Sequence, residues 1–309
     1  MRRSGISRVA LLALIWGSNF LWVKLAIRGL SPVEVTLARL VLGAGVLFAA
    51  VFARREAIPR SPALWGHITM AALFGNAIPY LLFALGEQHV ASSTAGMLNA
   101  TTPLWTVIIA LSVRHEKTAS LRQAVGLVIG FGGALLIFAP WQAASGLTSA
   151  GAIECLAAAV SYAISYVYMD CYLACRDISP VTLSACQLLA GSVMLAIALA
   201  ATGASSPRFS ATILASIAIL GLLGTGVAYV LNYQVITREG ATIASTVTYL
   251  LPVVAIILGV LVLGEHITLT VLTGIALVLS GVALTRRRGE PTEQQPQQSR
   301  STQQPHPDL

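Results

Sequence analysis

The feature of this chain that most constrains its fold is an internal duplication. Turn residues, aromatic residues and charges recur at a spacing of 148 or 149 residues. Such matches identify a repeat better than matched leucines would, because apolar segments match leucines by chance. The matched positions are Ser31-Pro32-Val33 with Ser179-Pro180-Val181, Tyr80 with Tyr229, Pro103 with Pro252, and Glu116 with Glu265.

The composition predicts that this duplicated unit lies in a membrane. Mean hydropathy is +0.79, and only 10% of the residues are charged, against roughly 25% in soluble domains. Ten apolar runs have the length needed to cross a hydrocarbon core of ~30 Å. They lie near residues 8–27, 33–53, 65–85, 91–112, 121–139, 150–170, 181–201, 211–233, 242–262 and 268–285.

Each copy of the repeat contains five of these runs. Because five is odd, the second copy must enter the bilayer from the opposite side. The expected fold is therefore an all-α integral membrane protein with ten transmembrane helices in two inverted five-helix repeats, residues 1–140 and 141–288. Secondary transporters commonly have this plan, with a solute site near the midplane between the halves. Residues 289–309, rich in Gln, Pro and Ser, are expected to form a disordered tail.

The distribution of Lys and Arg predicts the orientation, because short cytoplasmic loops retain positive charge. Basic residues precede span 1 and follow spans 2, 4 and 10, so we expect a multi-pass protein of the cell membrane with both termini and the tail in the cytoplasm. The net charge of +7 then reflects topology and indicates no nucleic-acid partner. A cleaved signal peptide is the alternative for the basic start, but Lys24 and Arg28 follow without a small-x-small cleavage site.

Several motifs resemble one known family. Their order and spacing are similar to the opening of EamA-like members of the drug/metabolite transporter superfamily. The resemblance covers about residues 8–285 and implies ten helices in two inverted repeats that export or exchange small metabolites, often amino acids. The residues that carry it are Trp16-Gly17-Ser18-Asn19-Phe20, Lys24, Ser31-Pro32, Arg39, Pro103 and Glu116.

The second repeat departs from this pattern at positions that would face a solute. Tyr162 and Ala163 stand where Trp16 and Gly17 stand, and Gln187 replaces Arg39. An asymmetric site is expected for an asymmetric solute.

Polar groups inside spans are costly in lipid and are candidate site residues. Arg39 lies roughly 10 Å into span 2, where it would bind a substrate carboxylate; the alternative is an Arg that is paired internally or reaches the interface. Lys24, nearer the end of span 1, is expected to extend to the interface. The amide candidates are Asn19, Asn76, Asn99, Gln187 and Asn232.

Glu154 is an unusual charge near the start of span 6. It would either carry a coupling proton or bind a substrate amine. The alternative is an interfacial Glu that the N-terminal end of the helix stabilises through its macrodipole.

Aromatic residues inside the spans are the other candidates for a solute site, since their rings combine apolar faces with a polar donor. The repeat relates Trp16 to Tyr162 and Tyr80 to Tyr229, so we expect these four in one midplane cavity that suits a zwitterionic or partly apolar metabolite. The full set is Trp16, Tyr80, Tyr162, Tyr166, Tyr229 and Tyr249. Pro103 and Pro252 are expected to kink spans 4 and 9, either as gates or as packing features.

The leading function is a secondary transporter that exports small organic solutes such as amino acids or related amphipathic compounds, and not an enzyme. There is no GxxxxGK[ST] phosphate loop for ATP hydrolysis. The alternatives are an intramembrane enzyme acting on a lipid and a channel or non-transporting scaffold. Neither a cofactor nor a metal is expected, because Cys155, Cys171, Cys175 and Cys186 contain no CxxC pair and lack a His at ligand spacing. Partners are the solute and the bilayer, and the assembly is a monomer or homodimer.

Overall fold

The computed structural model describes residues 3–90, 92–113, 121–138, 150–203, 207–251, 254 and 269–285. Within these ranges seven helices are long and apolar enough to cross a membrane, and three shorter apolar helices, Leu121–Leu136, Ala241–Leu251 and Leu272–Thr285, lie where three further spans are expected. The protein is therefore an all-helical, multi-pass membrane protein. The seven long helices are Ser7–Ala26, Pro32–Ala53, Pro62–His89, Thr94–Ser112, Ala150–Tyr172, Pro180–Thr202 and Ala211–Glu239.

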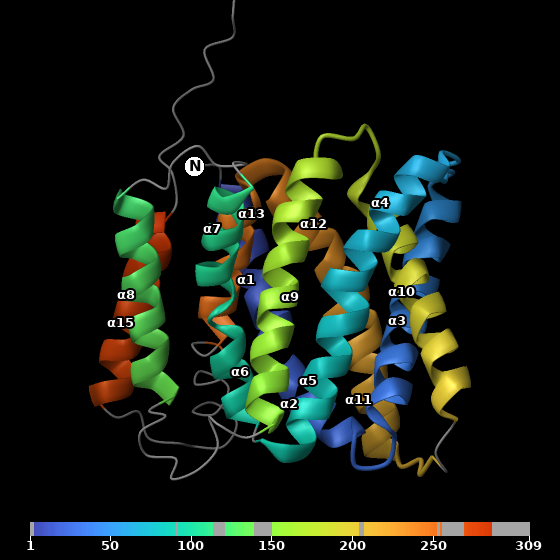
Figure 1. Ribbon diagram of the computed structural model, residues 1–309, viewed down its shortest axis with the longest axis horizontal. Helices are drawn as coiled ribbons and strands as arrows, with labels where there is room; N and C mark the ends of the chain where they lie inside the picture. The colour runs from blue at the N-terminus through green and yellow to red at the C-terminus, as the bar shows by residue number, and fades with distance from the viewer. Residues whose placement is uncertain are drawn as a thin grey trace, which may run out of the picture.

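The first half of the chain forms helices that run roughly along one common direction (Figure 1). Several expected spans consist of two helical segments. The elements are α1 (Arg3–Gly17), α2 (Asn19–Ala26), α3 (Pro32–Ala53), α4 (Pro62–Ala72), the π-helical turn η1 (Leu73–Ala77), α5 (Ile78–His89), α6 (Ser92–Asn99), α7 (Thr102–Ser112) and α8 (Leu121–Phe138).

The second half repeats this order. Its elements are α9 (Ala150–Tyr172), α10 (Pro180–Thr202), α11 (Ala211–Gly221), the π-helical turn η3 (Leu222–Val227), α12 (Ala228–Glu239), α13 (Ala241–Ser245) and α15 (Leu269–Thr285).

The duplicated Ser-Pro-Val motif begins the second helix of each half. Ser31 caps α3, where its hydroxyl and the Glu34 side chain form a reciprocal capping box. Ser179 caps α10 and accepts a hydrogen bond from the backbone N–H of Thr182. In both helices Pro occupies the first turn, where its missing N–H costs nothing.

The two π-helical turns lie at matched positions and face the opposite half. A Cβ atom on Gly75 of η1 would lie 2.4 Å from Ser165 Oγ, and one on Gly224 of η3 would lie 2.3 Å from Asn19 Oδ1. Glycine at both turns therefore leaves room for a polar side chain from the first span of the other half. Such π-turns inside α-helices are frequent at functional sites.

Side-chain hydrogen bonds between the halves are also reciprocal. Arg39 Nε donates to Thr225 Oγ1 at 3.0 Å, and Gln187 Nε2 donates to Asn76 Oδ1 at 2.7 Å. Arg39 and Gln187 are matched positions of the repeat, as are Asn76 and Thr225. The second span of each half therefore contacts the third span of the other half, and α3 packs extensively against α10.

α8 and α15 form a closely packed pair at one end of the molecule, on the left in Figure 1. Glycines make the approach possible, as is common between helices in lipid. A Cβ atom on Gly126 would lie 2.8 Å from the Gly281 carbonyl oxygen, and one on Gly133 would lie 2.7 Å from that of Gly274.

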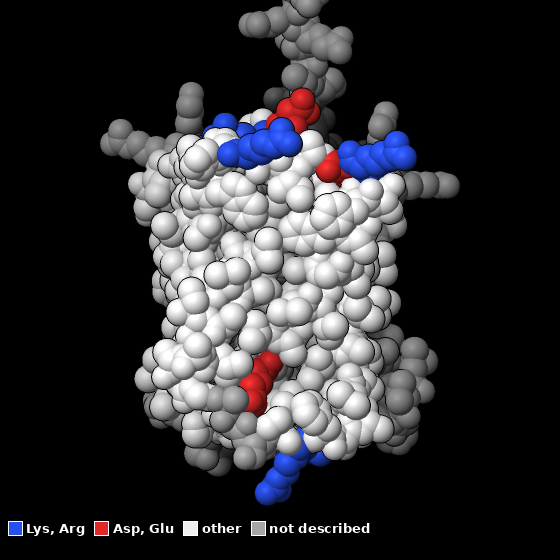
Figure 2. Space-filling model, turned by 90° about the vertical axis from the view of Figure 1, so that its right-hand side faces the viewer, with Lys and Arg blue, Asp and Glu red and all other residues white. Residues whose placement is uncertain are grey.

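Charged side chains gather toward the ends of the helices. Figure 2 shows a broad uncharged band across the middle of one face, with Lys and Arg at both ends and one acidic group in its lower part. A band of this kind is the surface expected to face lipid.

Pro103 interrupts span 4 less directly than expected. α6 ends at Asn99, and α7 resumes at Thr102, so Pro103 lies in the first turn of a new segment rather than inside a continuous helix. The Thr102 hydroxyl donates to the Asn99 carbonyl oxygen at 2.7 Å and satisfies the acceptor that Pro103 leaves free. Its partner Pro252 lies outside the described residues.

Candidate functional site

A cavity that is partly open to solvent lies between helices of the two halves. Its walls are mainly aromatic and apolar, with a few polar side chains, as is usual for sites of small organic molecules. The apolar lining consists of Trp16, Phe20, Val23, Tyr80, Phe83, Tyr162, Tyr166 and Leu251, and the polar lining of Asn19, Arg39, Glu87, Asn99 and Thr248.

The cavity brings together most of the candidates predicted from the sequence. Trp16, Asn19, Arg39, Tyr80, Asn99, Tyr162 and Tyr166 all line it. Four other candidates lie elsewhere: Asn76, Gln187, Tyr229 and Tyr249 are buried, but they are absent from the lining.

Arg39 projects from α3 and is only 5% exposed. Its guanidinium carbon lies 3.8 Å from the centroid of the Tyr80 ring, and its Nε donates to Thr225. Among the described residues no carboxylate lies within 4 Å of this guanidinium and neither terminal nitrogen has a hydrogen-bond partner. The site thus holds an oriented cation whose two terminal nitrogens are available to a ligand.

The first span is fastened to η3 at the wall of the cavity. Trp16 Nε1 donates to the Gly224 carbonyl oxygen at 3.1 Å, and Asn19 Nδ2 approaches the same oxygen at 3.5 Å. Gly75 is the residue of the first half that matches Gly224, and its carbonyl oxygen accepts a hydrogen bond from the Tyr229 hydroxyl. Tyr229 therefore supports η1, and it is not among the residues that line the cavity, whereas its repeat partner Tyr80 is.

Asn76, Gln187 and Tyr249 also hold helices together. Gln187 bonds Asn76 and accepts a hydrogen bond from the hydroxyl of Tyr233. Tyr249 donates to the Leu127 carbonyl oxygen at 3.2 Å, and its ring lies against Gly130 of α8.

Glu87 is the site residue that the sequence analysis missed. Span 3 was expected to end near residue 85, whereas α5 continues to His89, so Glu87 lies within the helix. The side chain is 0% exposed and lines the cavity. Its Oε2 accepts from Ser92 Oγ at 3.3 Å, and its Oε1 is buried without a partner among the described residues.

Lys24 is half-buried and binds the C-terminal end of α5. Its ammonium donates to the carbonyl oxygen of Glu87 and, at 3.0 Å, to that of Val90. A cation at this place satisfies free carbonyls at the end of α5 and complements the negative end of the helix.

Glu154 and Asn232 remain apart from this site. Glu154 is partly buried near the start of α9 and does not line the cavity. Asn232 is 2% exposed and is likewise absent from the lining. Within the described ranges no three His, Cys, Asp or Glu side chains are grouped as metal ligands, and the four cysteines are free thiols.

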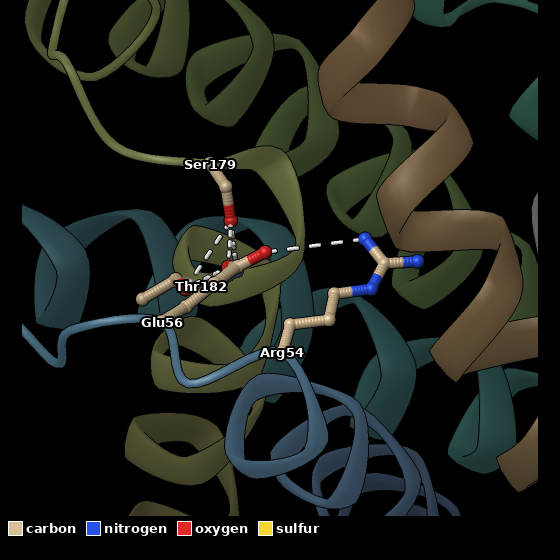
Figure 3. A network of polar contacts seen from close by, with 4 residues as sticks. All are labelled: Arg54, Glu56, Ser179 and Thr182. Atoms are coloured by element: carbon tan, nitrogen blue, oxygen red, sulfur yellow. Dashed lines mark hydrogen bonds and ion pairs between the residues drawn. The ribbon is translucent and has the colours of Figure 1, made fainter.

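A second network of polar side chains connects the loop after α3 to the start of α10 (Figure 3). Glu56, in the loop after α3, accepts hydrogen bonds from the hydroxyls of Ser179 and Thr182 at the start of α10. These two bonds hold the pKa of the Glu56 carboxyl below its usual value, with a smaller contribution from Arg54, whose Nη1 lies 3.9 Å away.

The fold is that of a helical membrane protein with a partly aromatic cavity between its two halves. The model of the EamA-like transporter family matches residues 3–139 and again residues 149–287. The chain belongs to this family of membrane transporters.

Similar proteins extend over nearly the whole chain. The uncharacterized transporter YoaV of Bacillus subtilis is 29% identical, covering 87% of this chain and 92% of its own length. A "probable terminal-alkyne amino-acid exporter" of Streptantibioticus cattleyicolor is 28% identical, covering 91% and 92%. A solved crystal structure matches with a TM-score of 0.75 at 19% identity, covering 92% of this chain and 96% of the other. This last similarity concerns the fold.

Proposed function

We propose that this protein is a secondary transporter of the cell membrane that exports a small organic solute, such as an amino acid or a related amphipathic compound. The observation that carries the proposal is the buried Arg39 guanidinium, which faces an aromatic cavity without a carboxylate partner among the described residues. A buried charge without a counter-ion is costly, so it is expected where a ligand supplies the opposite charge.

The proposed mechanism is alternating access between two inverted five-helix repeats, residues 1–140 and 141–288. The two family matches support this division. Arg39 bonds Thr225, and the matched residue Gln187 bonds Asn76, which matches Thr225. A pseudo-two-fold axis between the halves produces such a pair of equivalent contacts. Rocking of one repeat against the other would open the cavity to each side in turn.

Further parts of the proposal concern residues away from Arg39. Pro103 and Pro252 act as hinges of spans 4 and 9, and Glu154 is a candidate coupling group. Both termini, with the tail of residues 289–309, lie in the cytoplasm, and the protein works as a monomer or homodimer without enzymatic activity. The relative described as an amino-acid exporter supports this solute class at low identity.

The test is transport by purified protein in liposomes. We expect liposomes with protein to move at least one member of a panel of labelled amino acids and amphipathic cations faster than empty liposomes. For a carboxylate-bearing solute, Arg39→Gln should weaken the apparent affinity by about tenfold or more, because a hydrogen bond to a charged group contributes about 1.5–3 kcal/mol.

Arg238→Gln is the matched control, since Arg238 is exposed at the end of α12. This variant should transport as wild type does. Equal rates in protein-containing and empty liposomes across the panel would contradict the proposed function, and wild-type affinity in Arg39→Gln would remove Arg39 from the binding site.

A further inference from the structure

The cavity contains a second charged side chain, at some distance from Arg39. Glu87 belongs to α5 and is fully buried. One oxygen of its carboxyl has a single long hydrogen bond from Ser92, and the other has no partner in the described part of the chain. A carboxylate offers about four acceptor positions, so most of this capacity is unused in a place where water is largely excluded.

The basic residues near Glu87 do not fill these positions. Lys24 is the nearest candidate, but its ammonium is bonded to the main-chain oxygens of Glu87 and Val90, and no ion pair between the two side chains occurs within 4 Å. Arg39 lies on the Tyr80 ring and likewise forms no such pair. The carboxyl therefore remains available to a ligand in the cavity.

The spacing of the two charges restricts the shape of that ligand. The Arg39 guanidinium lies over the Tyr80 ring. Tyr80 and Glu87 are seven residues apart on α5 and thus about 10 Å apart along the helix. Arg39 and Glu87 therefore lie toward the two ends of one wall of the cavity. A short ligand that carries both an ammonium and a carboxylate matches this pair of opposite charges.

The wall between the two charges is apolar. Phe83 lies on the same face of α5 as Tyr80 and Glu87, and its ring packs against Phe20 and Tyr162. A side chain attached between the ammonium and carboxylate of a ligand would contact these rings.

We propose that Glu87 binds the ammonium group of the solute, so that Arg39 and Glu87 together select a short zwitterionic amino acid with an apolar side chain. The inference rests on the proposed transport function and adds a specificity-determining residue to its site. It also separates amino acids from simple carboxylates, which Arg39 alone would accept.

The test uses three probes that differ only in their charged groups: phenylalanine, 3-phenylpropionate, which lacks the ammonium, and phenethylamine, which lacks the carboxylate. Binding to the purified full chain is measured by calorimetry and by thermal stabilisation. We expect wild type to bind phenylalanine about tenfold or more tightly than either analogue.

Glu87→Gln should lower the affinity for phenylalanine by about tenfold or more and leave that for 3-phenylpropionate unchanged, which also shows that the cavity is intact. The double variant Glu87→Gln/Gln88→Glu moves the carboxylate to the exposed neighbouring residue without changing net charge, and it should behave like Glu87→Gln. Arg39→Gln should instead abolish the preference for phenylalanine over phenethylamine.

Three results would overturn the inference: wild type that binds none of the probes, wild type that binds 3-phenylpropionate as tightly as phenylalanine, and a Glu87→Gln variant that keeps the wild-type preference. Transport of a solute without an amino group would contradict the role of Glu87 while leaving the transport function standing. Failure of wild type to transport any solute of the panel would contradict the transport function itself.

Discussion

Tyr80 positions the Arg39 guanidinium, which lies over the face of the Tyr80 ring. The Arg39 guanidinium lies over this ring at 3.8 Å, while the Tyr80 hydroxyl forms no hydrogen bond with Arg39. The cation–π contact in a largely desolvated place contributes about 2 kcal/mol. The ring, more than the hydroxyl, therefore orients the guanidinium toward the cavity.

Tyr80→Ala should lower the affinity for a carboxylate-bearing solute by about 1–2 kcal/mol, because Arg39 loses its platform and the cavity loses an aromatic wall. Tyr80→Phe keeps the ring and is the matched control. Calorimetric titration of both variants measures the difference. If Tyr80→Phe loses as much affinity as Tyr80→Ala, the hydroxyl rather than the ring binds the solute.

At the scale of elements, the close contact of α8 with α15 depends on the absence of side chains. A Cβ atom on Gly281 would lie 2.4 Å from Gly130 N and 2.5 Å from the Gly126 carbonyl oxygen. Backbone atoms cannot move aside as a flexible side chain can, so the two helices would have to separate.

Gly281→Ala should therefore lower the free energy of unfolding by about 1–3 kcal/mol, the usual cost of overpacking. Gly132→Ala on α8 is the control, because a Cβ atom there meets nothing within 4 Å. Its stability should equal or slightly exceed that of wild type. Thermal denaturation in one detergent compares the three proteins, and equal melting temperatures would show that the pair tolerates a wider spacing.

The network of Figure 3 connects a loop of the first half to the start of α10 in the second. Hydrogen bonds from Ser179 and Thr182 lower the pKa of Glu56 from its usual value of 4.5. A carboxyl whose pKa is lower in the folded state stabilises the fold at pH above its unfolded value. This contribution disappears as the pH falls through the folded-state pKa.

The melting temperature of wild type should accordingly fall more steeply below pH 4.5 than that of Glu56→Gln. At neutral pH the variant should be the less stable protein, and the two should converge in acid. Melting curves between about pH 7 and pH 3 test this expectation. Parallel curves over the whole range would mean that other carboxyls dominate the acid response.

At the scale of the whole molecule, the proposed arrangement of five spans in each half predicts where the loops emerge. Reporter fusions after Arg60, Lys117 and Arg288 should report the cytoplasm, whereas fusions near Ser145 and Ser206 should report the exterior, because basic loops are retained inside. All except Arg60 lie outside the described residues. A cytoplasmic signal at Ser145 would contradict the inverted arrangement.

The sequence by itself determined the class of protein and most of the span positions. Long apolar runs can satisfy their backbone groups in lipid only as helices, and the structure places helices at these runs. The Ser-Pro-Val motifs identified the starts of α3 and α10, because capping and the first-turn preference of Pro are local properties. The family resemblance was likewise confirmed over both halves.

Only the tertiary structure decided which polar side chains face the cavity. In a span that is apolar all around, periodicity does not indicate which face meets lipid, another helix or a ligand. Gln187 and Asn76 were predicted as solute ligands, and in the structure they bond each other. Tyr229, also predicted as a ligand, bonds the Gly75 carbonyl oxygen of η1. Glu87 was overlooked because its burial depends on where α5 ends. The Lys24 ammonium binds the carbonyl oxygen of Glu87 across 63 residues of the chain, and a long-range contact of this kind leaves no local pattern in the sequence.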